Sequence, residues 1–266
     1  MRIQVLAVGA ALLMAAACAS NVQTTSGADY LARYDASYTP LAGGGHAEID
    51  AEIRQIAAVE PDIRFPARIG LARIEKGQLT TIPAREGEAW AAMTENLGGL
   101  YGEFVPVSPL IAAMVSPETD KPRYQYTAGD TIAEIRRGAA RQHLDYVLAY
   151  EVAVSGKNRG SALSVADLTV IGMFVLPGRS LEVEAAASGI LIDVRSGYPY
   201  ATLTAFADRK GLSRTINAWE VSQDMRKDAS AKAVLELAGE LRQSLEILAV
   251  RSSEMKAREA LPDAGS

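Results

Sequence analysis

Apolar residues recur at helical spacing in four stretches of the chain. The first predicted helix covers residues 48–59, ends at Glu60-Pro61, and is expected to turn one apolar face inward, formed by Ile49, Ile53, Ile56 and Ala57. Further helices are predicted over residues 84–101, 131–143 and 218–250. The helix at 131–143 is expected to begin at a cap on Asp130 or Thr131 and to bury Ile132, Ile135, Ala139 and Ala140. The last helix carries a continuous apolar stripe that suits the face of a sheet.

Alternating and continuous apolar runs predict strands between these helices. The predicted strands cover residues 68–74, 104–107, 144–154, 163–176, 181–195 and 198–207. Pro106 favours an edge position for the second strand, because proline cannot donate a ladder hydrogen bond. Strand–helix alternation therefore gives way to an antiparallel run before the closing helix. This order predicts an α+β fold, with a mixed, largely antiparallel sheet of about five to six strands packed by helices and a long carboxy-terminal helix.

The amino-terminal segment has the pattern of an export signal. Met1-Arg2 supplies a positive start, and Gln4 is the one polar residue between Ile3 and Ala17. This apolar run has the length of a signal-peptide core and is shorter than the roughly 20 residues that a membrane span needs. Residues 1–17 are therefore predicted to be a signal peptide.

Ala15-Ala16-Ala17-Cys18 resembles the lipobox of bacterial lipoproteins. The resemblance implies cleavage before Cys18 and attachment of lipid to its thiol, although the family prefers leucine where Ala15 stands. The alternatives are an ordinary secretory signal and a buried core helix. Ala19 follows the cysteine, whereas aspartate there is the usual inner-membrane retention signal of enterobacterial lipoproteins. The expected location is therefore the cell envelope, anchored and facing the periplasm, with the outer membrane favoured.

Four regions follow from these patterns: the signal peptide at 1–17, a lipidated cysteine and flexible tether at 18–47, one periplasmic domain at 48–250, and a frayed tail at 251–266. The tether prediction rests on abundant Ser, Thr, Gly and Ala. Tyr30, Tyr34 and Tyr38, spaced by four, are expected to line one side of a short helix that docks on the domain or on a partner.

The composition and the motifs of the chain favour a binding protein over an enzyme. The net charge of −5 argues against nucleic-acid binding, and the single cysteine excludes an internal disulfide. His46 and His143 are the only histidines, and neither has metal-ligand spacing, so no metal or cofactor is expected. No nucleotide-binding loop or serine-nucleophile motif occurs. Glu182 and Glu184 share a strand face, which is more typical of a solvated surface than of acid–base catalysis.

Arg136, Arg137 and Arg141 form a basic group on the predicted helix at 131–143. This group is a candidate patch for anionic lipid or an acidic partner, and a solvated helix face is the alternative.

The element order, with Leu144-Asp145-Tyr146-Val147 opening a central strand and Ile192–Tyr198 forming a strand–turn–strand, resembles a periplasmic α/β module. The module occurs in the curli-secretion lipoprotein, in lipoprotein activators of peptidoglycan synthases, and at the amino terminus of the Tol translocation protein. The resemblance covers about residues 65–250. It implies a non-catalytic, lipid-anchored binding or scaffolding protein with an envelope protein as partner and an unspecified oligomeric state. An envelope hydrolase and an oligomeric export component are the alternatives.

Overall fold

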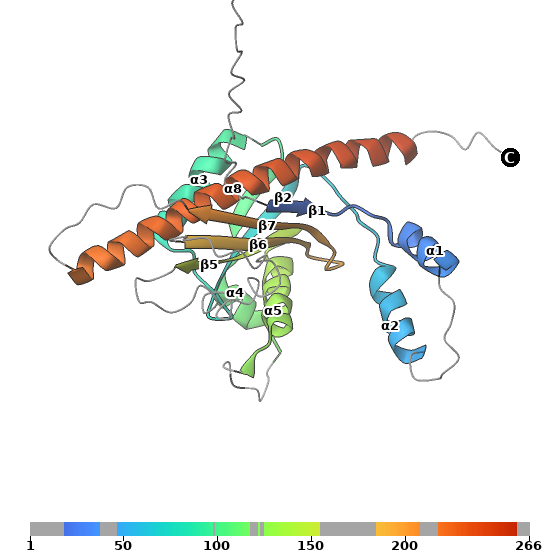
Figure 1. Cartoon of the computed structure of the whole chain (residues 1–266), viewed down its shortest axis with the longest axis horizontal. Helices are drawn as coiled ribbons and strands as arrows, with labels where there is room; N and C mark the ends of the chain where they lie inside the picture. The colour runs from blue at the N-terminus through green and yellow to red at the C-terminus, as the bar shows by residue number, and fades with distance from the viewer. Residues whose placement is uncertain are drawn as a thin grey trace, which may run out of the picture.

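The computed structural model places one mixed sheet between helices on both faces (Figure 1). It describes residues 19–37, 47–97, 99–117, 122, 125–154, 185–207 and 218–259. The predicted α+β class, the mixed and largely antiparallel sheet and the long carboxy-terminal helix are confirmed. The predicted strand at 163–176 lies outside the described residues.

The sheet has seven strands, against the five to six predicted, because the short segments at 19–22 and 78–80 pair with longer strands without a strand pattern of their own. The order is β1-β7-β6-β5-β2-β3, with β4 also paired to β2. Their bounds are β1 Ala19–Val22, β2 Ala67–Glu75, β3 Gln78–Thr80, β4 Gly102–Pro106, β5 Tyr146–Val154, β6 Ala185–Asp193 and β7 Pro199–Ala207. β2 pairs in parallel with β5 and β4 and antiparallel with β3. β4 and β3 share the outer side of β2, since β4 pairs with its first half and β3 with its end. Pro106 ends β4, so its predicted edge position is confirmed.

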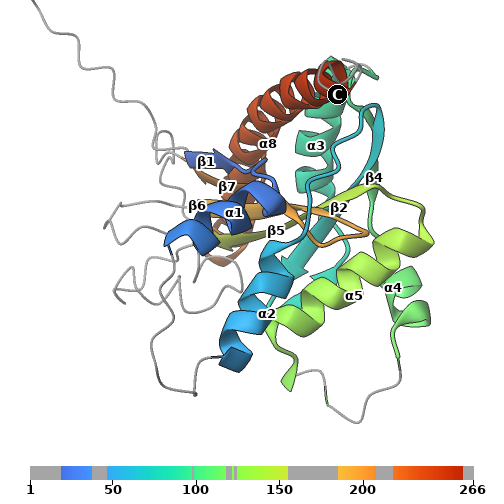
Figure 2. The same ribbon diagram turned by 90° about the vertical axis from the view of Figure 1, so that its right-hand side faces the viewer.

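The described chain has six helices, of which the last four in sequence lie on the two faces of the sheet and the first two lie beside it (Figures 1 and 2). They are α1 Gly27–Ser37, α2 Ala47–Ala57, α3 Ala84–Leu97, α4 Pro109–Val115, α5 Ala128–Arg141 and α8 Ala218–Glu259. On one face, α3 and α8 bury a cluster that includes Trp90, Leu237 and Leu241 against the strands. On the other face, α5 and α4 bury Ile135 and Ala112. Alternation along each strand divides its side chains between these two cores.

Helix α5 begins three residues earlier than the sequence predicted. Thr127 caps it, because the Thr127 hydroxyl accepts from the Asp130 N–H and the Asp130 carboxylate accepts from the Thr127 N–H. The prediction of a cap at Asp130 or Thr131 was wrong, since Asp130 is the reciprocal partner inside the first turn. Ile135 and Ala139 are fully buried as expected, whereas Ala140 is exposed.

Helix α8 continues past the predicted end at residue 250. Ser252 is buried and its Oγ donates to the Ile63 carbonyl at 3.0 Å, and Met255 packs against the core. The helix has 42 residues and so spans about 63 Å. The prediction of a frayed tail was therefore wrong up to Glu259, because tertiary contacts hold the last turns in place; residues 260–266 lie outside the described residues.

The region after Cys18 forms regular structure where a flexible tether was predicted. Ala19–Val22 pairs antiparallel with β7, and Gly27–Ser37 forms helix α1. Tyr30 and Tyr34 stack on this helix as the spacing predicted, with ring centroids 6.2 Å apart. Tyr38 lies outside the described residues. The tether prediction was wrong for residues 19–37, because pairing with β7 orders a segment whose own composition favours flexibility.

Candidate functional site

Among the predicted site residues, Cys18 lies outside the described residues, as do His46, Glu182 and Glu184. Cys18 is covalently joined to Ala19, the first residue of β1. His143 is exposed and adopts a left-handed conformation (φ 56°) in the turn between α5 and β5. Its carbonyl accepts from Arg68 Nη1 at 3.3 Å, and this hydrogen bond links the turn to β2.

The predicted basic group divides into two parts. Arg136 lies against the turn between β6 and β7, where its Nε donates to the Val194 carbonyl at 3.1 Å and its Nη2 to the Arg195 carbonyl at 2.8 Å. Arg137 and Arg141 are exposed on α5. Arg136 therefore holds a hairpin turn, and only the other two arginines are presented to solvent.

Three tyrosine hydroxyls fasten the amino-terminal segments to the sheet. Tyr198 Oη donates to the Thr25 carbonyl at 2.9 Å, and Tyr200 Oη accepts from the Asp62 N–H at 2.8 Å. Tyr146 Oη accepts from the Arg64 N–H at 2.6 Å. The rings of Tyr146 and Tyr200 meet edge to face, with centroids 5.4 Å apart. Residues 62–64 are thus bonded to β5 and β7, and residue 25 to the turn just before β7.

Burial raises the pKa of Tyr146 to about 12 and also raises the pKa of Tyr200. Both hydroxyls are protonated in the folded and unfolded chain below about pH 10. Above that pH the unfolded chain ionises first, so stability is expected to fall between about pH 10 and 12, by up to about 1.4 kcal/mol per pH unit for each hydroxyl. Urea unfolding midpoints at pH 8, 10 and 11 measure this. The Tyr146→Phe variant should show a smaller decline, and an equal decline in variant and parent would contradict the assignment.

A buried ion pair supports α3. Arg73 Nε donates to Glu86 Oε2 at 2.9 Å, and the two side chains are 8% and 3% exposed. Glu86 also accepts from Tyr150 Oη at 3.1 Å and from Ser230 Oγ at 2.5 Å, while Arg73 donates to the Ile74 carbonyl. Burial and the charge of Glu86 raise the pKa of Tyr150. Each partner of the pair is hydrogen-bonded, as a buried charge requires. These hydrogen bonds join β2, β5, α3 and α8.

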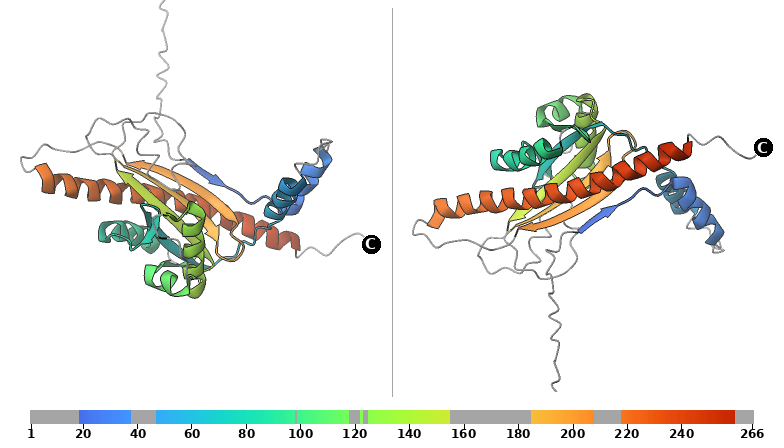
Figure 3. Two further views of the ribbon diagram at one scale, coloured as in Figure 1. Left: turned by 90° about the horizontal axis from the view of Figure 1, so that it is seen from below. Right: turned by 90° about the horizontal axis from the view of Figure 1, so that it is seen from above.

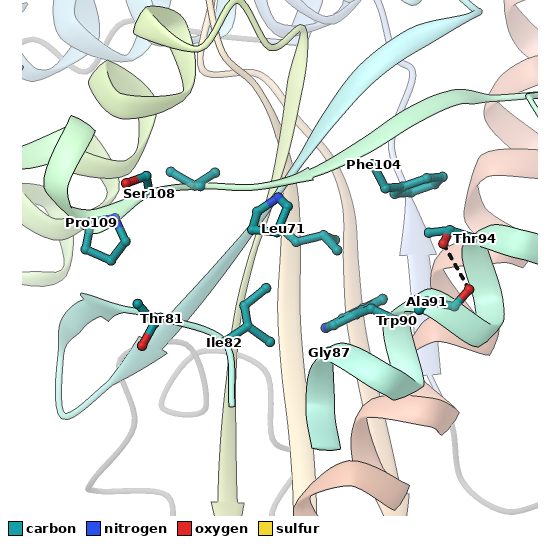
Figure 4. Close-up of a pocket in the computed structure, with 12 residues that line it drawn as sticks. Leu71, Thr81, Ile82, Gly87, Trp90, Ala91, Thr94, Phe104, Ser108 and Pro109 are labelled. Atoms are coloured by element: carbon teal, nitrogen blue, oxygen red, sulfur yellow. Dashed lines mark hydrogen bonds between the residues drawn. The ribbon is translucent and has the colours of Figure 1, made fainter. Parts of the chain in front are cut away.

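An open groove of about 530 Å³ lies where α3 faces β4 and the start of α4 (Figure 4). Trp90 and Phe104 line one side of Leu71, and Ser108 and Pro109 lie on the other (Figure 4). Trp90 also meets the Tyr150 ring edge to face, with centroids 5.3 Å apart. The buried ion pair therefore fixes the helix that forms one wall of the groove. The remaining lining residues are Thr81, Ile82, Gly87, Ala91, Thr94, Pro106 and Val107.

The groove is lined mainly by apolar side chains and a few hydroxyls, and it contains few reactive groups. Its polar side chains are the hydroxyls of Thr81, Thr94 and Ser108, and Thr94 Oγ1 donates to the Ala91 carbonyl at 3.0 Å. In the part of the chain that the structure describes, no cluster of three or more His, Cys, Asp or Glu is placed to bind a metal. No described helix is long and apolar enough to cross a bilayer. The arrangement suits binding of an apolar segment.

No family model matches this sequence, and no curated protein matches it. Two solved structures to which it is similar are PelC dodecamers from Paraburkholderia phytofirmans, one of them a point variant. Each is 17% identical; the alignments cover 67% and 66% of this chain and 92% of theirs, with TM-scores of 0.29 and 0.28. A bacterial aryl acylamidase of the amidase signature family is 15% identical over 74% of this chain and 50% of its own, with a TM-score of 0.21. Scores this low assign neither a fold nor a function to this chain.

Proposed function

We propose that this chain is a lipid-anchored, periplasm-facing lipoprotein of the cell envelope that binds or scaffolds another envelope protein without catalysis. The observation that carries the proposal is the signal-like run that ends in Ala15-Ala16-Ala17-Cys18. Ala19 then begins β1, so a lipid on Cys18 would be attached one residue from the sheet. An anchor at this point keeps the domain at high local concentration beside membrane-bound partners.

The groove beside β4 supports the binding part of the proposal. β4 pairs with β2 on one side, and the described chain pairs nothing with its other side. An extended segment of a partner can hydrogen-bond to such an edge and place apolar side chains against Trp90 and Phe104. β1 and β4 lie at opposite edges of the sheet (Figure 2). The anchor and the contact surface therefore occupy different sides of the domain.

A photo-crosslinking residue at Thr94, inside the groove, is expected to capture an envelope protein in cells. The same residue at Arg251, exposed on α8, is not. Gly87→Phe places a ring in the groove, where a side chain at Gly87 meets open space. It is expected to reduce capture from Thr94 by about tenfold or more, equivalent to roughly 1.4 kcal/mol of binding free energy. Mass spectrometry identifies and quantifies the product.

Gly239→Phe is the matched control, because Gly239 is also a helical glycine with open space at its Cβ position and lies on α8 outside the groove. It should leave capture unchanged. Equal capture from Thr94 and Arg251 would contradict the groove as the contact surface. Hydrolysis of a cell-wall or ester substrate by the purified protein would instead support an enzyme.

A further inference from the structure

Helix α2 exposes an apolar face that the described fold does not cover. Ile49, Ile53 and Ile56 follow one another at spacings of four and three residues, and their exposed fractions are 53%, 38% and 67%. The sequence predicted that these residues point into the core, and that prediction was wrong. We call these three side chains the isoleucine stripe. Apolar side chains exposed to water contribute no burial free energy to the fold. The stripe is therefore suited to contact with an apolar surface outside the described fold.

The stripe is held in place by the opposite side of α2. Arg54 Nη1 contacts Asp35 Oδ1 of α1 at 2.5 Å, and its guanidinium lies 5.3 Å from the centroid of the Tyr34 ring. At the end of α2, a Cβ on Gly27 would lie 2.4 Å from the Ala57 carbonyl oxygen, so α1 and α2 meet at a point where only glycine fits. The α1–α2 pair is therefore one unit with the isoleucine stripe on its surface.

The α1–α2 unit is in turn fixed to the sheet near β1. Glu60 Oε1 accepts from the Ala28 N–H at 2.7 Å and from Ser26 Oγ at 3.1 Å, and these bonds lower the pKa of Glu60. Tyr198, the residue before β7, donates from its Oη to the Thr25 carbonyl just before α1. Figures 2 and 3 show α1 and α2 on the side of the molecule that carries β1, away from α4. Helices α1 and α2 thus lie beyond the end of β1, beside the sheet edge that β1 forms.

We propose that the isoleucine stripe lies in the surface of the membrane that holds the protein. The inference rests on the proposed lipid anchor. In the processed chain, Cys18 alone precedes β1, so the acyl chains begin one residue from the sheet edge beside which α1 and α2 lie. Helix α2 carries three acidic residues, Glu48, Asp50 and Glu52, and one basic residue, Arg54. This charge favours zwitterionic over anionic headgroups as the contact surface.

The test uses the full lipidated protein in vesicles of phosphatidylcholine and phosphatidylethanolamine that contain a nitroxide-labelled lipid. Lipidation blocks the Cys18 thiol, so an introduced cysteine is the single site for an environment-sensitive fluorophore. Ile56→Cys reports on the stripe. Met114→Cys, on α4, is the matched control because it is also an apolar helical residue with high exposure, 79% against 67%. Radiolabelled palmitate incorporation is measured on the same preparations.

The probe at Ile56 is expected to lose roughly half or more of its emission to the nitroxide, because an interfacial helix lies about 5–10 Å into the headgroup and acyl boundary. The probe at Met114 should keep its emission. Adding Ile49→Ser and Ile53→Ser should restore most of the emission at Ile56 while the palmitate label is retained.

Equal quenching at both positions in palmitate-labelled protein would overturn this inference and leave the anchor intact. Absence of palmitate would remove the proposed anchor itself. Crosslinking between Ile56→Cys residues of two copies, without quenching, would also overturn the inference and assign the stripe to a second copy of the chain.

Discussion

Arg73→Ala is expected to lower the free energy of unfolding by about 3–5 kcal/mol, because it leaves the Glu86 carboxylate buried without its charged partner. Glu86 is buried, and its remaining donors are the neutral hydroxyls of Tyr150 and Ser230. The substitution also removes the donor to the Ile74 carbonyl. Urea denaturation followed by circular dichroism measures the change.

Arg242→Ala is the control for this prediction. Arg242 forms an exposed i,i+4 pair with Glu246 at 3.7 Å, and such pairs contribute only about 0.3–0.5 kcal/mol. The Arg73 variant should also weaken photo-crosslinking from Thr94, since the same cluster positions α3 and the Trp90 wall of the groove. A destabilisation below about 1 kcal/mol would show that Arg73 and Glu86 do not form a closed buried pair.

Cys18→Ser is expected to abolish palmitate labelling and to move the protein from the membrane to the soluble fraction. The physical reason is that stable attachment needs two or more acyl chains, and a serine hydroxyl does not replace the thiol that would carry the diacylglyceryl group. Cell fractionation and labelling measure both effects. Ser20→Ala, two residues later on the exposed part of β1, should change neither. Retention of the Cys18 variant on the membrane would count against the anchor.

The main elements of the fold follow from local sequence patterns because their apolar positions alternate or recur with a clear period. Residues 144–154 predict β5 closely, and residues 84–101 predict α3 apart from its last turn, which stops at Leu97. The Gly98-Gly99 pair in the sequence explains that stop, since glycine is unfavourable inside a helix and Gly99 has a positive φ of 66°.

The buried cluster left a signal in the sequence that periodicity could have revealed. Arg73 alternates with Leu71 and Ile69 and so shares their buried face of β2. Glu86 lies one helical turn before Trp90, on the side of α3 that continues to Met93 and Leu97. A charge on each of two apolar faces predicts that the two charges meet inside the protein. The pairing can be recognised only when the patterns of β2 and α3 are considered together.

Strand β1 and the groove were beyond local prediction. Ala-Ser-Asn-Val has little strand character of its own, and β1 depends on pairing with β7 from a distant part of the chain. Just after β1, the Gln23 N–H donates to the Tyr200 carbonyl, and the Tyr198 hydroxyl donates to the Thr25 carbonyl. The groove combines short pieces of β2, α3 and β4 with the loop at residues 81–82 and the start of α4. The isoleucine stripe shows the reverse case, where a periodic pattern correctly predicts a helix and wrongly predicts the direction that its apolar face takes.

The mass of the intact protein extracted from membranes shows whether Cys18 carries lipid. We expect a chain that begins at Cys18, lacks residues 1–17, and carries the added mass of a diacylglyceryl group, with or without a further acyl chain on the new amino terminus. Fragmentation should place all of that mass on Cys18. A mature protein that begins elsewhere, or that begins at Cys18 with a free thiol, would contradict the lipid anchor and the membrane-facing role that depends on it.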